Sequence, residues 1–248
     1  MTIGNEQDLE GIRAAGRVVA LTLAAMRAAV EPGITTAVLD DIGARVIRAA
    51  GGRSAPQLVY GFPGMNLISV NDEVVHGVPG FRRIERGDVV KLDVTVELDG
   101  YIADAAETVL VPPVSGLATR LQRCAGAAFR KGMAAAQVGS PVRLIGAAVE
   151  RKVRDRGFYV LRELSGHGVG RTIHESPTIP NYESPFAHER LAEGAVITIE
   201  PLISESRTRA FTDVDGWTIR TRDGCLAAHH EHTIIVWREG PEVVTEAA

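Results

Sequence analysis

The sequence predicts an α+β fold made of two similar halves. Two helical patterns are followed by strand patterns twice along the chain, and proline and glycine separate the two helices of each half. Neither a Pro/Ser-rich linker nor a low-complexity tract lies between the halves. We therefore expect residues 1–248 to form one pseudo-symmetric domain.

The first half is expected to begin with a helix from Asp8 to Val30, where apolar residues recur at helical spacing. Glu31-Pro32-Gly33 ends this helix. Either Thr35 or Thr36 can cap a second helix, which stops at Gly51-Gly52. The apolar face of the second helix is expected to comprise Val38, Leu39, Ile42, Val46 and Ile47.

Strand patterns fill residues 57–111 and complete the first half. In the second half, Ser115 to Gln137 has helical spacing. Ser140-Pro141 then supplies a capping hydroxyl and a first-turn proline for a fourth helix that runs to about Arg156. From Phe158 onward the pattern is again rich in strands.

The composition excludes several classes of protein. Lys and Arg number 27 against 31 Asp and Glu, and the basic residues are scattered, which argues against a nucleic-acid partner. No apolar run approaches the length of about 18 residues that a membrane span requires, and the acidic N-terminus lacks a secretory segment. Two cysteines, Cys124 in an expected helix and Cys225 in an expected loop, make no disulfide framework. We expect a cytoplasmic protein without a membrane partner.

Two aspartates fall on one face of a predicted hairpin. Residues 90–98 alternate apolar and polar side chains, and Asp99-Gly100 is a two-residue turn. Pairing across this turn places Thr95 opposite Asp104 and makes Asp93 its diagonal neighbour, about 7–8 Å away. Two such carboxylates raise each other's pKa unless a cation lies between them, so a divalent metal or a metal pair is one interpretation. The other is that both are solvated positions on the polar face of a sheet.

Three further residues could complete a metal site. His167 and His174 lie in SGHGVGRTIHESP, where glycines let the backbone pass close to a ligand, and this favours a functional role over a structural one. Glu200 ends a β-branched run and Glu231 lies in an apolar strand. A carboxylate buried there needs a partner, which could be a metal or an arginine.

The combined set of four carboxylates and one imidazole suits two divalent ions such as Mn, Fe(II), Co or Zn. A pair of ions roughly 3.5–4 Å apart lowers the pKa of a bridging water and supplies hydroxide at neutral pH. The members of this set are Asp93, Asp104, His167, Glu200 and Glu231.

The ordered motifs resemble those of the type I methionine aminopeptidases, a family of the pita-bread fold. The likeness runs from about residue 5 to 240 and rests on YGFPGMNLISVNDEVVHGVPG, GDVVKLDVTVELDGYIADAAET, GHGVGRTIHESP, GAVITIEP, DGWTIRTRDG and EHTIIV. The resemblance implies an antiparallel sheet with pseudo-twofold symmetry covered by two helix pairs, in a single catalytic domain spanning 1–248. It also implies removal of the initiator methionine from nascent proteins whose second residue is small.

The resemblance assigns roles to individual residues. The five metal ligands fall on the set above and imply two divalent ions of undetermined identity. Glu200 is similar to the proton shuttle, and His76 and His174 match the catalytic histidines that contact substrate. Nascent-chain N-termini, met at the ribosome or free, are the expected partners, and a monomer is expected. The methionine pocket is expected to contain Phe62 and Trp217, with Val59, Leu67 and Ile173 as neighbours.

The chain departs from the family pattern at several positions. Tyr60 replaces a usual histidine, and Val75 and Ser165 replace frequent cysteines. His229 and His230 replace an amide and an aromatic residue. Because side chains alternate along a strand, we expect His229 to share the face of Glu231 and to influence metal affinity or pH dependence, with His230 and His232 pointing away.

Two other functions stay open. Xaa-Pro peptidases share the fold and the ligand pattern, although they usually carry a large additional N-terminal domain. A pita-bread protein that binds peptides without catalysis is the second alternative, although such proteins lose ligands and all five positions are kept here. The short segment between Glu200 and Glu231 leaves no room for the helical subdomain of type II enzymes, which favours the short bacterial form.

Overall fold

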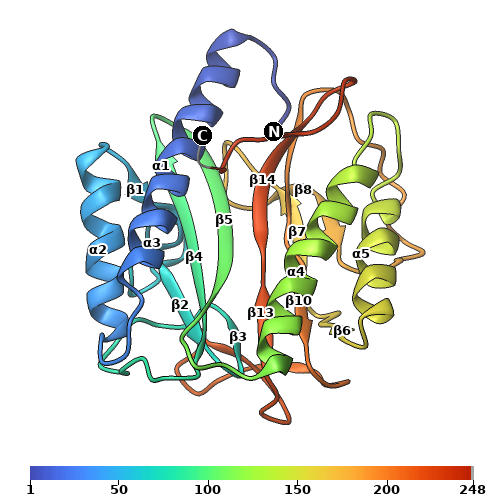
Figure 1. The fold of residues 1–248 in the computed structure, drawn as a ribbon. Helices are drawn as coiled ribbons and strands as arrows, with labels where there is room; N and C mark the ends of the chain where they lie inside the picture. Colours follow the sequence, from blue (N-terminus) through green and yellow to red (C-terminus); the bar gives the residue numbers. More distant parts are fainter. Residues whose placement is uncertain (247–248) are drawn as a thin grey trace.

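The four long helices lie on one side of a sheet in the computed structural model, which describes residues 1–246 (Figure 1). α1 (Glu6–Ala29) and α2 (Thr36–Ala49) cover one half of the molecule. α4 (Gly116–Ala135) and α5 (Arg143–Asp155) cover the other half. The predicted α+β class with two helix pairs is confirmed. None of the helices in residues 1–246 is long and apolar enough to cross a membrane.

The main sheet has nine strands, and its central path runs β1-β4-β5-β14-β9-β7-β8. β2 pairs with β4 and β15 pairs with β14, and every pairing is antiparallel. The contact between β5 and β14 joins the two halves into one sheet. The strands are β1 (Arg53–Ser54), β2 (Leu67–Val70), β4 (Val89–Leu98), β5 (Tyr101–Leu110), β7 (Ser165–Gly168), β8 (Glu175–Pro180), β9 (Ala195–Ile199), β14 (Glu231–Val236) and β15 (Glu242–Val243).

Two small sheets complete the strand arrangement. One has the order β13-β10-β6 and the other β11-β12-β3. Their strands are β3 (Glu73–Val75), β6 (Tyr159–Val160), β10 (Leu202–Ser204), β11 (Ala210–Thr212), β12 (Ile219–Thr221) and β13 (Ala227–His229).

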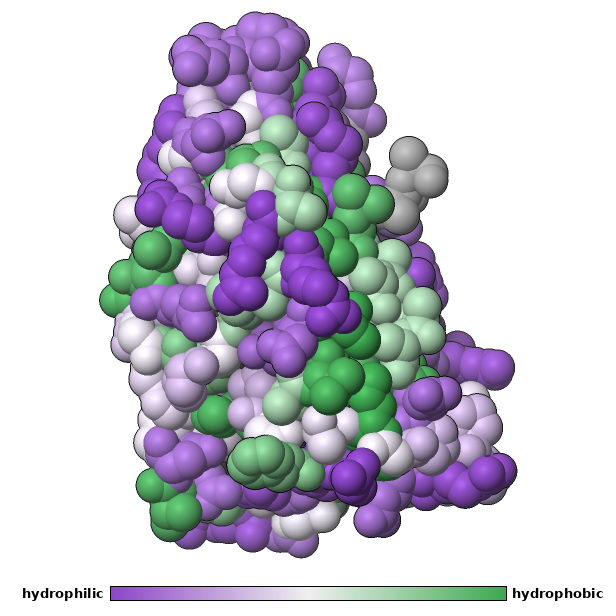
Figure 2. Space-filling view, turned by 90° about the vertical axis from the view of Figure 1, so that its left-hand side faces the viewer, coloured by the Kyte–Doolittle hydropathy of each residue, from purple (hydrophilic) through white to green (hydrophobic). Residues whose placement is uncertain are grey.

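Each helix pair packs its own apolar cluster against the sheet. In the first half, Met26 of α1 and Leu39 of α2 are fully buried over β4 and β5. In the second half, Ile145 and Val149 of α5 are fully buried with α4 and β9. The outward side of the α1–α2 half is mostly hydrophilic, with hydrophobic residues gathered in a band along it (Figure 2). The sheet is therefore held from one side by two cores, and its other face is free to form a site.

Most helix ends agree with the sequence prediction. Thr35 caps α2 through its side chain, which accepts a hydrogen bond from the Val38 amide, and Ser115 caps α4 in the same way. Val38 was wrongly included in the apolar face of α2, because its side chain is 46% exposed. Cys124 lies buried in α4, and Cys225 lies in a loop, as expected.

Two predictions about local structure were wrong. The strand pattern was extended too far toward the N-terminus, because a short helix, α3 (Ala55–Tyr60), capped by the Ser54 hydroxyl, occupies its beginning. Ser140 does not cap α5, which begins at Arg143 without a side-chain cap. The Ser140 carbonyl instead accepts a hydrogen bond from the Leu191 amide. The backbone of residues 139–142 pairs with residues 189–191 instead, and the helix begins only at Arg143.

The predicted hairpin register is confirmed. In the β4–β5 pair Leu98 lies opposite Tyr101 and Thr95 opposite Asp104, as the two-residue turn requires. The polar face of this hairpin is not solvated, because Asp93 and Asp104 are only 7% and 6% exposed. The interpretation of these aspartates as solvated surface positions is therefore wrong.

Candidate metal centre and substrate pocket

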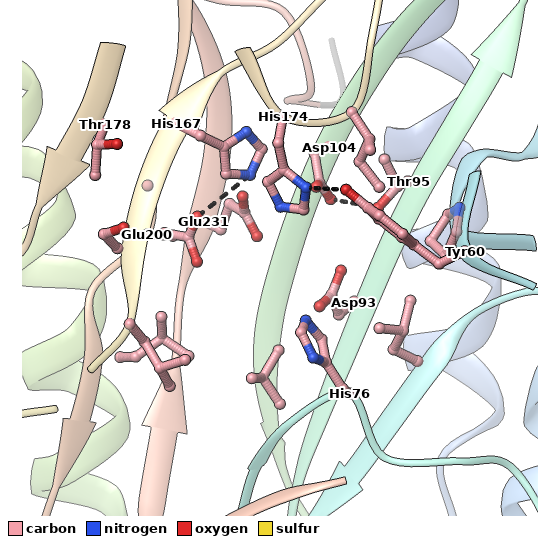
Figure 3. Close-up of a pocket in the computed structure, with 18 of the residues that line it drawn as sticks. Tyr60, His76, Asp93, Thr95, Asp104, His167, His174, Thr178, Glu200 and Glu231 are labelled. Carbon is pink, nitrogen blue, oxygen red and sulfur yellow. Dashed lines mark hydrogen bonds and ion pairs between the residues drawn. The ribbon is translucent and has the colours of Figure 1, made fainter. Parts of the chain in front are cut away.

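The five predicted ligands line one cavity of about 530 Å³. The cavity lies on the face of the sheet that the helices leave free, and the side chains point toward one another in front of the strands (Figure 3). His76 and His174 line the same cavity, as do Phe62 and Trp217. The structure thus brings the predicted ligands, both histidines and both aromatic residues into one cavity.

The first half contributes two carboxylates from one hairpin. Asp93 projects from β4 and Asp104 from β5. The Thr95 hydroxyl donates a 2.9 Å hydrogen bond to Asp104 Oδ1 and fixes that carboxylate. Burial and the neighbouring carboxylates, Glu231 among them, raise the pKa of both aspartates well above the ordinary value. A positive partner would therefore favour the ionised form of each aspartate.

His167 is placed by close backbone packing around β7. A Cβ on Gly166 would lie 2.6 Å from the Thr198 carbonyl oxygen, and one on Gly168 would lie 2.3 Å from that of Ser176, so neither position accepts a side chain. His167 Nδ1 lies 2.9 Å from the Gly168 carbonyl oxygen. Because a carbonyl only accepts hydrogen bonds, Nδ1 carries the proton and Nε2 has a free lone pair. Nε2 lies 3.5 Å from Glu200 Oε1, where it can act as a metal ligand.

Glu200 and Glu231 complete the ligand set from the second half. Glu200 follows β9 and accepts a 3.1 Å hydrogen bond from the Thr198 hydroxyl. Glu231 begins β14, and its Oε1 is buried without a hydrogen-bond partner. Burial raises the pKa of Glu231 to about 8 and that of Glu200 well above its ordinary value. An unpartnered oxygen on a buried carboxylate is costly unless something binds it.

Divalent ions fit these residues. Two groups of three ligand atoms, each within 4.8 Å of one another, share Glu231. Burial raises the pKa of all four facing carboxyl groups, and the oxygen of Glu231 has no hydrogen-bond partner; bound cations would offset both effects. Oxygen donors with a single imidazole in each group are typical of hard or borderline divalent ions. The groups are Asp93, His229 and Glu231, and Asp104, His167 and Glu231.

His229 shares the face of Glu231, as predicted, and its ring also lies within reach of the proposed metal ligands. Its Nε2 lies 3.4 Å from Glu231 Oε2 and 3.9 Å from Glu200 Oε2. Both of its ring nitrogens are buried without a hydrogen-bond partner. His230 and His232 point away, and both rings pack against Phe129. Spacing did not identify His229 as a ligand, because alternation gives the face of a side chain but not its reach.

His76 and His174 face the same site from opposite halves (Figure 3). His76 follows β3 with a left-handed backbone (φ 60°), which turns its imidazole into the cavity. Burial lowers the pKa of His76 to about 4, so this ring is neutral at pH 7. Burial also lowers the pKa of His174, which lies against the His167 ring with centroids 4.3 Å apart.

Tyr60 lines the cavity and makes a contact that the sequence did not reveal. Its hydroxyl lies 2.5 Å from His174 Nδ1 (Figure 3). When Tyr60 donates to Nδ1, the proton of neutral His174 lies on Nε2. The sequence marked this position only as a departure from a family pattern, because a contact across 114 residues leaves no local signal.

An apolar wall closes one end of the cavity. The rings of Phe62 and Trp217 meet edge to face with centroids 5.3 Å apart. Leu67 and Ile173 also line the cavity, as predicted. Val59 does not line it, because it lies on the outer side of α3 and is 50% exposed.

Comparisons with known proteins agree with this geometry. Residues 10–238 match the model of metallopeptidase family M24. Methionine aminopeptidase 2 of Bacillus subtilis is 40% identical over 99% of this chain and all of its own length. The methionine aminopeptidase of Clostridium perfringens is 39% identical over 97% of each chain.

Solved structures give the same result. The methionine aminopeptidase of Thermotoga maritima superposes with a TM-score of 0.96 at 32% identity over the full length of both chains. A prolidase from Pyrococcus furiosus superposes with a TM-score of 0.81 at 21% identity over 66% of its length. The second likeness is one of fold, and the predicted antiparallel sheet with two helix pairs is common to both.

Proposed function

Since the chain belongs to metallopeptidase family M24 and is a metal-dependent hydrolase, we propose that it removes the N-terminal methionine from proteins whose second residue is small. The observation that carries this proposal is the meeting of a carboxylate-rich ligand set, two neutral histidines and an aromatic wall in one cavity. The ligands can hold metal, the histidines can contact a peptide bond, and the wall can receive an apolar side chain.

We propose that two divalent ions are held by Asp93, Asp104, His167, Glu200 and Glu231, and that Co, Mn, Fe(II) or Zn suits this set. When bound, the ions supply Lewis acidity and an activated water for hydrolysis of a peptide bond. The short distance between His229 and Glu231 supports a contribution of His229 to metal affinity.

His174 is proposed to stabilise negative charge on the carbonyl oxygen of the scissile bond. The hydrogen bond from Tyr60 leaves the proton of His174 on Nε2, which is then a donor. Its neutral state matters, because lowered pKa values keep both His174 and its neighbour His167 uncharged at pH 7. A preorganised neutral donor costs little rearrangement as charge develops on the substrate.

Glu200 is proposed to transfer the proton, and His76 is proposed to position the substrate. The ionised carboxylate of Glu200, which lines the cavity, can accept a proton from the attacking water and deliver it to the leaving amine. His76 enters the cavity from the other half and can hold the nitrogen of the first peptide bond. Glu200 thus accounts for the proton that the leaving amine gains, and His76 for the position of the peptide nitrogen.

The methionine side chain is proposed to lie against Phe62 and Trp217, with Leu67 and Ile173 beside them. A snug apolar wall discriminates similar side chains by about 1–3 kcal/mol per methylene, which is enough to prefer methionine over smaller residues. The substrate partners are then the N-termini of nascent chains. We further propose a monomer with a single catalytic domain, acting in the cytoplasm and in part at the ribosome.

The test is a peptide assay with purified, metal-loaded protein and three substrates that begin Met-Ala, Met-Leu and Xaa-Pro. We expect rapid cleavage of the Met-Ala peptide, slow cleavage of the Met-Leu peptide and loss of both activities with a chelator. Restoring each metal in turn identifies the ion that supports activity. Chelator-resistant cleavage, or a preference for the Xaa-Pro peptide, would contradict the proposal and favour a prolidase-like activity.

A further inference from the structure

A second cavity lies on the helix-covered side of the sheet. It has a volume of about 630 Å³, within the range of about 300–1,000 Å³ that small-molecule sites occupy. Its walls come from α4, the end of α5, β5 and β13. No step of the proposed peptidase reaction uses it.

Four arginines line this second cavity. Arg120, Arg123 and Arg130 project from α4, and Arg156 follows α5. Within residues 1–246 none of the four makes an ion pair or a side-chain hydrogen bond, whereas Arg13 and Arg220, for example, are paired with carboxylates. Four unpaired guanidinium groups around one cavity repel one another, and a bound anion removes that repulsion.

The lining contains one carboxylate, and it is already neutralised. Glu107 pairs with Arg27 of α1 at 2.9 Å, and burial raises its pKa. The cavity therefore retains a net positive charge although the whole chain has a formal charge of −4. This local excess was hidden in the sequence, because the arginines are spread over 37 positions of the α4–α5 segment.

The inner wall of the cavity is shaped for a ligand. A Cβ on Gly126 would make ordinary contacts, 3.6 Å from Arg130 and 3.9 Å from the His230 ring, so this position accepts a side chain that would occupy the corner between them. Cys124, Ala127 and Phe158 give an apolar surface beside the arginines. An apolar wall next to several cations suits a molecule that has both a ring system and a strongly anionic chain.

We propose that this second cavity binds a ligand carrying two or more phosphate groups. Guanidinium groups bind phosphate oxygens in pairs, and such groups concentrate more negative charge in this volume than carboxylates do. The arginines would hold the phosphates, and the apolar wall would receive a nucleoside where the ligand has one. Inorganic triphosphate and a nucleoside triphosphate share this chemistry and differ only in their use of the apolar wall.

The same cavity touches the candidate metal centre through one side chain. His229 lines the second cavity, while its Nε2 lies 3.4 Å from Glu231. Thr108 accepts a 2.9 Å hydrogen bond from the His229 amide and holds this residue at the boundary. A ligand that contacts the His229 ring would therefore be separated from the proposed metal-binding carboxylates by this one side chain.

The test is calorimetric titration of the metal-loaded protein with inorganic triphosphate and with ATP, with free metal in excess over ligand so that chelation does not empty the metal centre. We expect one ligand per chain, and binding that weakens about tenfold in each of Arg123→Gln and Arg130→Gln, because each loses a charge-assisted hydrogen bond. The control is Arg45→Gln/Arg48→Gln, which removes two exposed arginines of α2 and should leave binding unchanged.

A second variant tests the cavity without altering its charge. Gly126→Leu fills the open corner beside His230 and keeps all four arginines, so it should abolish binding. Leucine also favours a helix over glycine, so this variant should fold. Tighter binding of ATP than of triphosphate would place a nucleoside on the apolar wall, and equal binding would assign recognition to the phosphates alone. No binding of either probe, or binding that survives Gly126→Leu and both arginine variants, would overturn the proposal.

Discussion

The two halves of the molecule share an order of two helices followed by strands, yet they supply the candidate ligands differently. The first half offers Asp93 and Asp104 from a single hairpin closed by a two-residue turn. The second half offers His167, Glu200 and Glu231 from three separate strand segments that meet only through β9. One contribution is fixed by local register, and the other depends on the whole sheet being assembled.

The largest expected effect comes from a ligand that both metal groups share. Glu231→Gln should lower kcat/KM by about a thousandfold or more, because several kcal/mol of metal-dependent transition-state stabilisation are lost. Metal content, measured by atomic absorption after dialysis, should fall toward zero. Asp104→Asn removes a ligand from one group only and should leave one ion bound.

The control for this comparison is Glu97→Gln, which removes a carboxylate from the same hairpin at its far end, where it pairs with Arg53. Its metal content and activity should stay unchanged. If Asp104→Asn loses both ions as Glu231→Gln does, the two halves do not hold the ions in different ways, and the contrast between them fails.

The two histidines give the next largest effect, one from each half. His174→Ala should lower kcat about a hundredfold to a thousandfold, since a donor to the developing oxyanion is lost. His76→Ala should act mainly on KM, because it loses a contact that is made to the bound substrate as well. Steady-state kinetics on a Met-Ala peptide separates the two, and a pure KM effect in His174→Ala would contradict its assigned role.

Tyr60→Phe should have a smaller effect, about tenfold in kcat, because losing one neutral hydrogen bond costs about 1 kcal/mol and frees the tautomer of His174. The ring and its contact with His174 remain. If Tyr60 acts through the tautomer of His174, the pH dependence of kcat should change on its acid side, and KM should stay unchanged. Tyr182→Phe, which removes a hydroxyl far from the cavity, serves as the control and should show neither change.

These residues also show how far the sequence could predict the site. The Asp93–Asp104 geometry was predictable because a two-residue turn fixes the register of its strands. A functional role for His167 was predicted from its flanking glycines, and the close backbone packing requires glycine at both positions. The hydrogen bond from Tyr60 and the unpaired arginines around the second cavity were not predictable, because both arise where distant segments meet.

Lys91 illustrates the same limit within the hairpin itself. Alternation placed it on the polar face, yet it is 1% exposed, and its Nζ donates to the carbonyl oxygens of Asn71 and Val89. Burial lowers its pKa to about 7. Period-two patterning gives the face of a side chain, and only the assembled β2–β3 turn decides whether that face meets water.

The metal-free protein should have a pH-dependent stability that comes from the shared ligand. Glu231 has a pKa of about 8 when folded, above its unfolded value, so its stabilising contribution is full at low pH and is lost as the pH rises toward 8. Lys91 acts in the opposite direction, because its lowered pKa makes stability rise above pH 7. The measurement is therefore the difference in unfolding free energy between wild type and Glu231→Gln in urea, which cancels Lys91.

This difference should fall between about pH 4.5 and pH 8 in the metal-free protein and level off above pH 8, since only the wild type must ionise Glu231. Metal loading should reverse the trend, because the ions favour the ionised carboxylate. A flat difference in the metal-free protein would show that Glu231 ionises normally, and the case for a missing positive charge would then rest on the ligand geometry alone.

The smallest expected effect concerns the second helix of each half, because α2 has a side-chain cap and α5 has none. Thr35→Ala removes the hydroxyl that caps α2 and should lower the free energy of unfolding by about 1 kcal/mol. Ser140→Ala should change it by less than about 0.5 kcal/mol, because α5 begins without a side-chain cap and the backbone of Ser140 pairs with Leu191. Urea unfolding of the metal-loaded protein measures both. Equal losses would mean that Ser140 caps α5 after all, and that the two helix pairs begin alike in solution.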